Sequence, residues 1–466
     1  MDEISRNISI LLNVEKSFIP KAEYVFRTFG KILGLQPNFY YEYTLEDIHV
    51  YYGPPVEDKR PIEIYYNKQA ADFFNKQNNF SEEIHFLNYR NENIPFLFSK
   101  PGQLFLYTAK SLEIKKDIIS SAFFFLSCWE EYTQGKNDIC HQNKKKNAPK
   151  KQAQQLTIQR TWDFEDIPIV DRYCDIFQKA LETMLPGYQR QMKLPHNKDF
   201  AASVSHLIAG DDIERNDSSE RKKTKKKQSI DLTTQKLIST TRLLNQIKRE
   251  KNLKSTPEFF LPIELPGNLH EKQLKDINSL ISLILSSVSD KTIGIFADKE
   301  VTTEQINESY SKYVEQGFIV QGYYQNCWCH HYQPLMKILE ETDIKYDISI
   351  SYCDVLGYRA GISYPYYPYN IKENKPFTIL EIPQVINNTL FTSIPRSKRF
   401  IKNHIKYLID DATLYKTHFG IIWNHSQISP LNDLNFDYYL RLLKLVLKRN
   451  AWLSSPHDIY YHWMDR

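Results

Sequence analysis

The chain has 466 residues, 41% of them hydrophobic, so it is long enough to form two domains with buried cores. Its 60 basic and 56 acidic residues leave a net charge of +4, which is too small to indicate a nucleic-acid-binding protein. Six cysteines in this length argue against a disulfide-rich secreted scaffold. The sequence shows neither a secretory signal nor an apolar run of about 18 residues, and we therefore expect a cytoplasmic protein without a membrane span.

The first third of the chain predicts mixed α/β structure. Asn7–Val14 and Ile48–Tyr52 are short runs of strand-forming residues, whereas Lys21–Leu33 has the apolar spacing of a helix. Ile118–Tyr132 is an apolar segment that ends in charged residues, which most simply indicates a buried helix. The polar stretch Gly135–Gln155 interrupts this pattern and is typical of a loop.

A domain boundary is predicted near residue 195. The helix expected over Val170–Leu185 must stop at Pro186 and Gly187, and a polar linker follows it. We therefore divide the chain into an N-terminal mixed α/β domain, residues 1–195, and a second domain, residues 196–466.

The second domain alternates strands and helices. The expected strands are Ala201–Ala209, Glu258–Pro262 and Lys291–Phe296, and the expected helices are Thr233–Glu250, Glu271–Ser287 and Thr303–Gln316. A basic insertion at about residues 215–230 is most simply a solvated loop. Such alternation predicts parallel βα units, either open or closed into a barrel. The 14 glycines include no phosphate-binding motif, which argues against nucleotide binding.

The segment Tyr346–Asn370 has the composition of a binding-site wall. Gly357 and Gly361 allow close backbone approach, and Arg359 offers a planar set of donors. Flat faces with polar tips come from Tyr364, Tyr366, Tyr367 and Tyr369. These residue types suit the binding of sugars or carboxylates.

The order of several segments resembles the polysaccharide deacetylases of the NodB-homology family, in a bacterial subgroup with an extra N-terminal α/β domain. The segments are Ser121–Tyr132, Lys251–Pro262, Tyr346–Asn370, Leu380–Leu390, Ile421–Ser426 and Trp452–Trp463. The resemblance implies a distorted (β/α)7-type barrel with its site at the carboxyl ends of the strands. It also implies a role in carbohydrate or surface-glycan metabolism, with a carbohydrate or glycan precursor as the binding partner.

Members of this family hydrolyse acetyl groups with a divalent metal held by one Asp and two His, together with an Asp base and a His acid. At the matching positions this chain has Leu207 for the base, Ala209 for the metal-binding Asp and Phe296 for one metal-binding His. None of these side chains accepts a proton or binds a cation. The resemblance therefore predicts that the chain binds no metal cofactor.

The acid His is displaced by one residue. The family pattern Trp-His-Asn appears here as Trp423, Asn424 and His425, and on a strand the shift turns the imidazole to the opposite face unless a bulge restores it. His425 and Arg359 are the candidate catalytic remnants. The candidate binding residues are Arg359, Tyr364, Tyr366, Glu381, Trp423, His206 and His331.

These substitutions favour a catalytically degenerate protein, a pseudoenzyme that keeps a sugar-binding cleft. An alternative is an active carbohydrate deacetylase or esterase with relocated acids, using His425 with Asp211 or Asp212. A third is a scaffold whose N-terminal domain mediates assembly with a protein partner that the sequence does not identify. A zinc site over residues 327–331 is less favoured, because structural zinc usually binds two separated ligand pairs.

Overall fold

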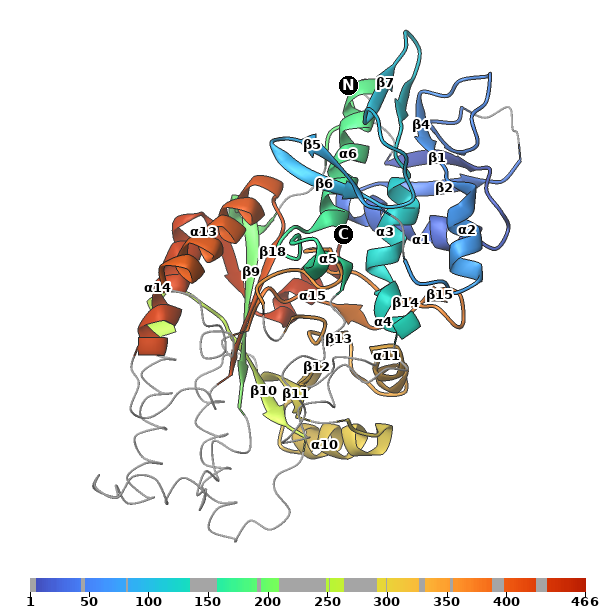
Figure 1. Ribbon diagram of the computed structural model, residues 1–466. Coiled ribbons are helices and arrows are strands. Elements are labelled where there is room, and N and C mark those ends of the chain that lie inside the picture. The colour runs from blue at the N-terminus through green and yellow to red at the C-terminus, as the bar shows by residue number, and fades with distance from the viewer. Residues whose placement is uncertain are drawn as a thin grey trace, which may run out of the picture.

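The computed structural model describes residues 6–42, 47–80, 83–134, 157–190, 194–208, 249–250, 252–263, 291–298, 300–326, 332–352, 355–387, 398–424 and 434–466. Two sheets with helices packed on them form a mixed α/β protein (Figure 1). Two short antiparallel hairpins complete the described strands: β5 (His85–Tyr89) with β6 (Glu92–Phe96), and β14 (Tyr369–Asn370) with β15 (Lys375–Pro376).

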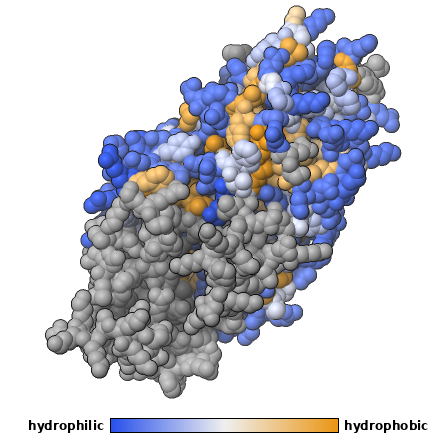
Figure 2. All heavy atoms as spheres, viewed as in Figure 1, coloured by the Kyte–Doolittle hydropathy of each residue, from blue (hydrophilic) through white to orange (hydrophobic). Residues whose placement is uncertain are grey.

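The first sheet has six strands in the order β2-β1-β3-β4-β8-β7. Its strands are β1 (Asn7–Leu12), β2 (Gln36–Tyr40), β3 (Val50–Gly53), β4 (Ile62–Tyr65), β7 (Phe105–Tyr107) and β8 (Leu112–Ile114). All neighbouring strands are parallel except β7 and β8, which are antiparallel. Figure 2 shows hydrophobic side chains gathered in the upper middle of the molecule in this view, with hydrophilic side chains around them.

The N-terminal part also contains helices that pack around this sheet (Figure 1). They are α1 (Ile19–Leu33), α2 (Lys68–Asn75), α3 (Ile118–Leu126), α4 (Trp129–Gln134), α5 (Ile158–Thr161) and α6 (Ile169–Met184). The segment predicted as one helix over Ile118–Tyr132 is therefore two. The helices separate at Cys128, whose φ of +44° is incompatible with a continuous right-handed helix.

The second sheet has nine strands, and every pair among them is parallel. The path β16-β13-β12-β11-β10-β9-β18-β17 is joined by β19, which pairs with β9. The strands are β9 (Phe200–Leu207), β10 (Glu258–Pro262), β11 (Thr292–Ala297), β12 (Ile319–Gln325), β13 (Tyr346–Asp347), β16 (Leu380–Glu381), β17 (Ile386–Asn387), β18 (His418–Asn424) and β19 (Ala451–Ser454).

This parallel sheet must be strongly curled. Its edge strands β16 and β17 are separated along the chain by only four residues, 382–385. That connection spans at most about 18 Å. In a flat sheet the seven strand spacings between the two edges would hold them about 34 Å apart. The mixed α/β class and the barrel-like parallel sheet are thus as the sequence predicts.

The helices of this part are α10 (Thr303–Glu315), α11 (Tyr332–Glu340), α13 (Lys398–Tyr415), α14 (Leu434–Lys448) and α15 (Pro456–Met464). α13 and α14 lie beside β9 and β18 (Figure 1). A buried cluster joins them, with Val204 and Ile421 from the sheet and Leu408 and Leu443 from the helices. Among the described residues, no helix is both long enough and apolar enough to span a membrane.

Several predicted elements agree with the structure within one or two residues, notably β10, β11, α6 and α10. The helices predicted over Thr233–Glu250 and Glu271–Ser287 lie almost entirely outside the described residues, as does the basic insertion. Both sheets contribute to one hydrophobic core, which contains Ile10 of β1 as well as Phe296 of β11. The division of the chain at residue 195 stays a prediction.

Gly357 and Gly361 let two parts of the protein approach each other. Gly357 has φ of +148°, and a Cβ added to it would lie 2.2 Å from the carbonyl oxygen of Glu165. The neighbouring Tyr358 amide donates to that same oxygen at 2.8 Å. At Gly361, the carbonyl accepts the amide of Val170 at 2.7 Å. The close approach expected from these glycines therefore involves the loop before α6 and its first turn.

Gly357→Ala should lower the free energy of unfolding by at least about 2 kcal/mol, because both backbone strain and a clash with Glu165 arise. Urea denaturation followed by circular dichroism measures the change. Gly102→Ala is the matched control, because Gly102 also has a positive φ, +128°, but has no atom within 4 Å of an added Cβ. Equal losses in the two variants would show that the approach to Glu165 is not tightly packed.

Candidate functional site

Arg359 is buried and paired within the protein. Its Nε and Nη2 atoms donate to the two carboxylate oxygens of Glu131 in α4. The exposed fractions of the two side chains are 3% and 12%. A bidentate pair in so dry a place fixes both side chains. The guanidinium predicted to face a ligand thus joins the loop after β13 to the N-terminal part.

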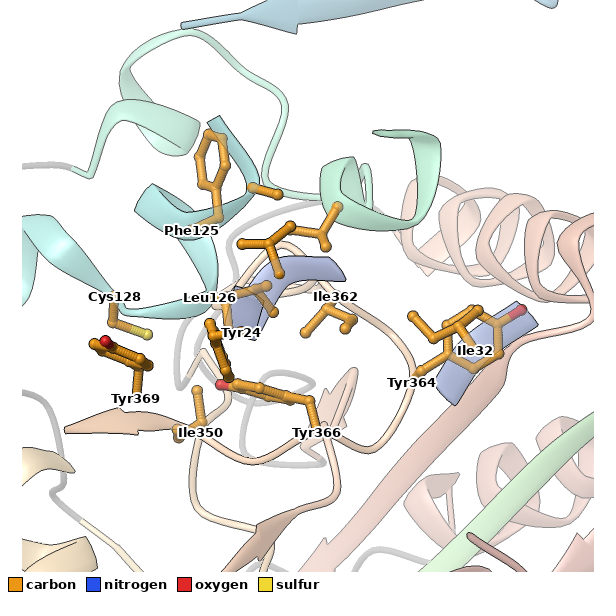
Figure 3. Packing of buried hydrophobic residues seen from close by; sticks show 14 of the residues in the cluster. Tyr24, Ile32, Phe125, Leu126, Cys128, Ile350, Ile362, Tyr364, Tyr366 and Tyr369 are labelled. Carbon is orange, nitrogen blue, oxygen red and sulfur yellow. The ribbon is translucent and has the colours of Figure 1, made fainter. Parts of the chain in front are cut away.

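Tyr364, Tyr366 and Tyr369 of the same segment are also internal, whereas Tyr367 is half-buried. The Tyr364 hydroxyl accepts from Arg190 Nη2 at 2.5 Å and donates to the Tyr415 carbonyl at 2.9 Å. Tyr366 exchanges two backbone hydrogen bonds with Glu381, at 2.8 and 3.0 Å. Figure 3 shows Tyr364, Tyr366 and Tyr369 among buried residues of the core. The described residues of this segment, 346–352 and 355–370, are therefore mostly buried, and we call them the seam. Direct contact of their side chains with a sugar stays a prediction.

Arg359→Met should destabilise the protein by about 3 kcal/mol, because it leaves the Glu131 carboxylate nearly buried without its partner. Adding Glu131→Gln should recover part of that loss. Chemical denaturation of both single variants and the double variant measures the coupling free energy. The control is the exposed pair Lys337–Glu373. There, Lys337→Met and Glu373→Gln should have a coupling free energy of less than about 0.5 kcal/mol.

Trp423 and His206 face the helices outside the curled sheet. Trp423 packs on Tyr439 of α14 with ring centroids 4.5 Å apart. His206 Nε2 lies 3.1 Å from Glu250 Oε2, and its ring stacks on Phe259. Both side chains are fully buried. Alternation along β9 and β18 explains their direction, because their neighbours Leu207 and Asn424 then take the inner face.

The inner face at the carboxyl end of the sheet carries a different set of residues. β-Sheet register places Leu207 beside Asn424, and Phe296 beside Tyr324. The Phe296 and Tyr324 rings stack with centroids 5.6 Å apart. Asn387 Nδ2 donates to the Tyr324 hydroxyl at 3.3 Å. We call Leu207, Phe296, Tyr324, Asn387 and Asn424 the inner-face group.

The inner-face group carries no ionisable side chain apart from the Tyr324 phenol. Leu207 and Phe296, at the positions that the resemblance gives to the base and to a metal-binding His, are each only 1% exposed and belong to the hydrophobic core. Asn424 holds the inward position that the resemblance gives to the acid His. Sequence reasoning missed Tyr324 and Asn387 as site residues. Their only signal was the alternation that places them on the same face as Leu207 and Phe296.

Other predicted site residues cannot be placed with this group. Ala209, Asp211, Asp212, His331 and His425 lie outside the described residues, as does the whole Cys–His segment at 327–331. Within the described part of the chain, no three His, Cys, Asp or Glu side chains form a group that could hold a metal ion. The relocated-acid and zinc hypotheses therefore stay predictions.

Glu258 is the first residue of β10 and lies on the same face of the sheet as Leu207. Its Oε1 accepts the Tyr346 hydroxyl at 2.5 Å, and its Oε2 accepts the His457 amide at the start of α15 at 3.1 Å. Burial raises the pKa of Glu258 from its usual 4.5 to about 8, despite these hydrogen bonds. Register places Glu258 beside Ser205 of β9, two residues before Leu207, so a buried carboxyl group lies next to the inner-face group on its amino-terminal side.

Glu258→Gln should change how stability depends on pH. The folded-state pKa of Glu258 is raised. The stability that its proton supplies is therefore fully present below the unfolded-state pKa and is lost as pH rises through about 8. Between about pH 5 and pH 9 the variant should gain roughly 2 kcal/mol relative to the unmodified protein. Urea titrations across that range test this. A constant difference between the two proteins would contradict a buried, protonated Glu258.

Two of three comparisons with known proteins found a match. A model described as "Family of unknown function (DUF7033)" matches residues 10–186, which contain the first sheet and α6. No curated protein matches the chain. A solved structure from Mycobacterium smegmatis, described as a "putative polysaccharide deacetylase", is similar at 11% sequence identity. That similarity has a TM-score of 0.41 and covers 59% of this chain and 93% of the other.

Proposed function

We propose that this chain is a polysaccharide-deacetylase-like protein of carbohydrate or surface-glycan metabolism that binds a sugar at the inner-face group without hydrolysing it. One observation carries the proposal. Leu207, Phe296 and Asn424 share the inner face at the carboxyl end of the parallel sheet, at the positions that the resemblance gives to the base, a metal ligand and the acid.

Hydrolysis of an acetyl group needs groups that move protons and polarise the carbonyl. Loss of a general base alone costs about 10² to 10⁴ in rate. Without a metal ion, a bound water keeps a pKa far above neutrality. Leucine and phenylalanine do neither task, and the amide of Asn424 does not act as a proton donor near neutral pH. These replacements favour binding over catalysis.

The same residues suit a neutral sugar. The amides of Asn387 and Asn424 and the hydroxyl of Tyr324 offer donors and acceptors that match sugar hydroxyls. The stacked rings of Phe296 and Tyr324 are each only 1% exposed, so the C–H face of a pyranose would reach their apolar surface only by displacing the side chains that cover them. The inner-face group contains no carboxylate and no basic side chain, so it favours an uncharged ligand.

Metal content and acetate release test the loss of catalysis. We expect purified protein to bind substoichiometric zinc, cobalt or nickel by elemental analysis after loading. We also expect acetate release from an acetylated chitin oligosaccharide to match the buffer control. Stoichiometric metal, together with acetate release that His425→Ala abolishes, would overturn the proposal and establish the enzyme with relocated acids.

Sugar binding is tested by calorimetry with neutral oligosaccharides, with an N-acetylglucosamine oligomer as the first probe. Tyr324→Phe and Asn387→Ala should each weaken binding about fivefold to tenfold, as expected for one lost hydrogen bond. Tyr107→Phe on the exposed edge strand β7 is the matched control and should bind normally. Binding that is equal in all variants, or absent with every glycan tried, would instead favour a scaffold.

A further inference from the structure

Asp347 and Glu381 form a buried pair of carboxyl groups. They end the neighbouring strands β13 and β16, and the parallel register sets them directly side by side. Both residues are 0% exposed. Each of the two carboxyl groups influences the pKa of the other. Carboxyl groups set side by side can hydrogen-bond to each other only when at least one of them carries a proton.

Nearby hydrogen-bond donors fix the position of each of these two carboxyl groups, which we call the acid pair. Ser349 donates to Asp347 twice, from Oγ at 2.6 Å and from its amide at 3.2 Å. The amide of Ile350 donates to Glu381 Oε1 at 2.9 Å. Donors of this kind stabilise one negative charge at the pair. They come from the start of the buried seam, so the pair and the seam are fixed together.

The described groups around the pair include one cation. Arg359 acts on Glu381, and its Nε and Nη2 atoms donate to the Glu131 carboxylate. The other described groups that act with the pair are neutral: Cys128 and Tyr366 near Glu381, and Tyr323 of β12 near Asp347. Full ionisation of the pair would therefore place two negative charges in contact within the core.

The pKa values agree in direction with this geometry. Burial is the main cause that raises the pKa of Asp347 to about 6. Burial, followed by the neighbouring Asp347 charge, raises the pKa of Glu381 well above its usual range. Because the two groups titrate together, these values describe the pair.

We propose that Asp347 and Glu381 share one proton, and that this proton keeps the seam docked between the two sheets. Its loss in alkaline solution places two like charges in contact and weakens the pairing of β13 with β16. The acid pair is therefore a pH-sensitive latch between the N-terminal part and the parallel sheet. It does not depend on sugar binding at the inner-face group.

Thermal unfolding of the full chain between about pH 5 and pH 9 tests the latch. The folded-state pKa values are raised, so the stability due to the shared proton is complete below about pH 4 and is lost as pH rises through them. Glu381→Gln keeps a hydrogen-bond donor without the charge. Its melting temperature should therefore rise by at least about 2 °C relative to the unmodified protein over this range.

Glu308→Gln on the exposed face of α10 is the control, and its curve should stay parallel to that of the unmodified protein. A parallel curve for Glu381→Gln as well would overturn the proposal.

Infrared spectroscopy gives a second, independent measurement. The unmodified protein should show a band of a protonated carboxylic acid at neutral pH that weakens at alkaline pH. In the same range, hydrogen exchange corrected for its intrinsic pH dependence should increase within residues 346–370 more than within β1. Asp347→Asn should remove part of the band. A band unchanged by both Asp347→Asn and Glu381→Gln would exclude the shared proton.

Discussion

The close approach of the backbone at Gly357 and Gly361 to residues 165–170 is the constraint on which the rest of the structure depends. It leaves no room for a side chain at Gly357, so the loop after β13 must lie directly against the start of α6. Every other feature of the seam follows from that contact. Arg359 reaches Glu131, most of the tyrosines become internal, and the two sheets share one core.

Much of the fold could be predicted from periodicity. β9, β10, β11, α1, α6 and α10 have strong apolar patterns, and their predicted bounds are close to those observed. The role of the seam could not be predicted in the same way, because glycine, arginine and tyrosine suit a polar junction between two layers as well as a ligand site. Which of the two they form depends on a partner such as Glu131, more than 200 residues away in the chain.

The candidate site shows that a sequence motif does not give the direction of a side chain on a strand. Motif matching selected Trp423 and His206, but each lies one residue from an inward position and faces the helices instead. Their neighbours Asn424 and Leu207 point inward because β9 and β18 pair in register along their whole length. Tyr324 and Asn387 join them only through register with other strands. A motif identifies a strand end, whereas the face of each residue is set by pairing that a single sequence does not display.

Leu207 also has a consequence for the mutations that the fold tolerates. Its side chain fills part of the core that β9 shares with the first sheet, so the position contributes to stability. A carboxylate placed there now would be buried beside Phe260 and Asn424 without a cation to compensate it. A substitution that introduces an acidic residue at position 207 would therefore have to be preceded by changes among the residues that pack against it. A packed apolar side chain thus limits which single mutations the protein tolerates at this strand end.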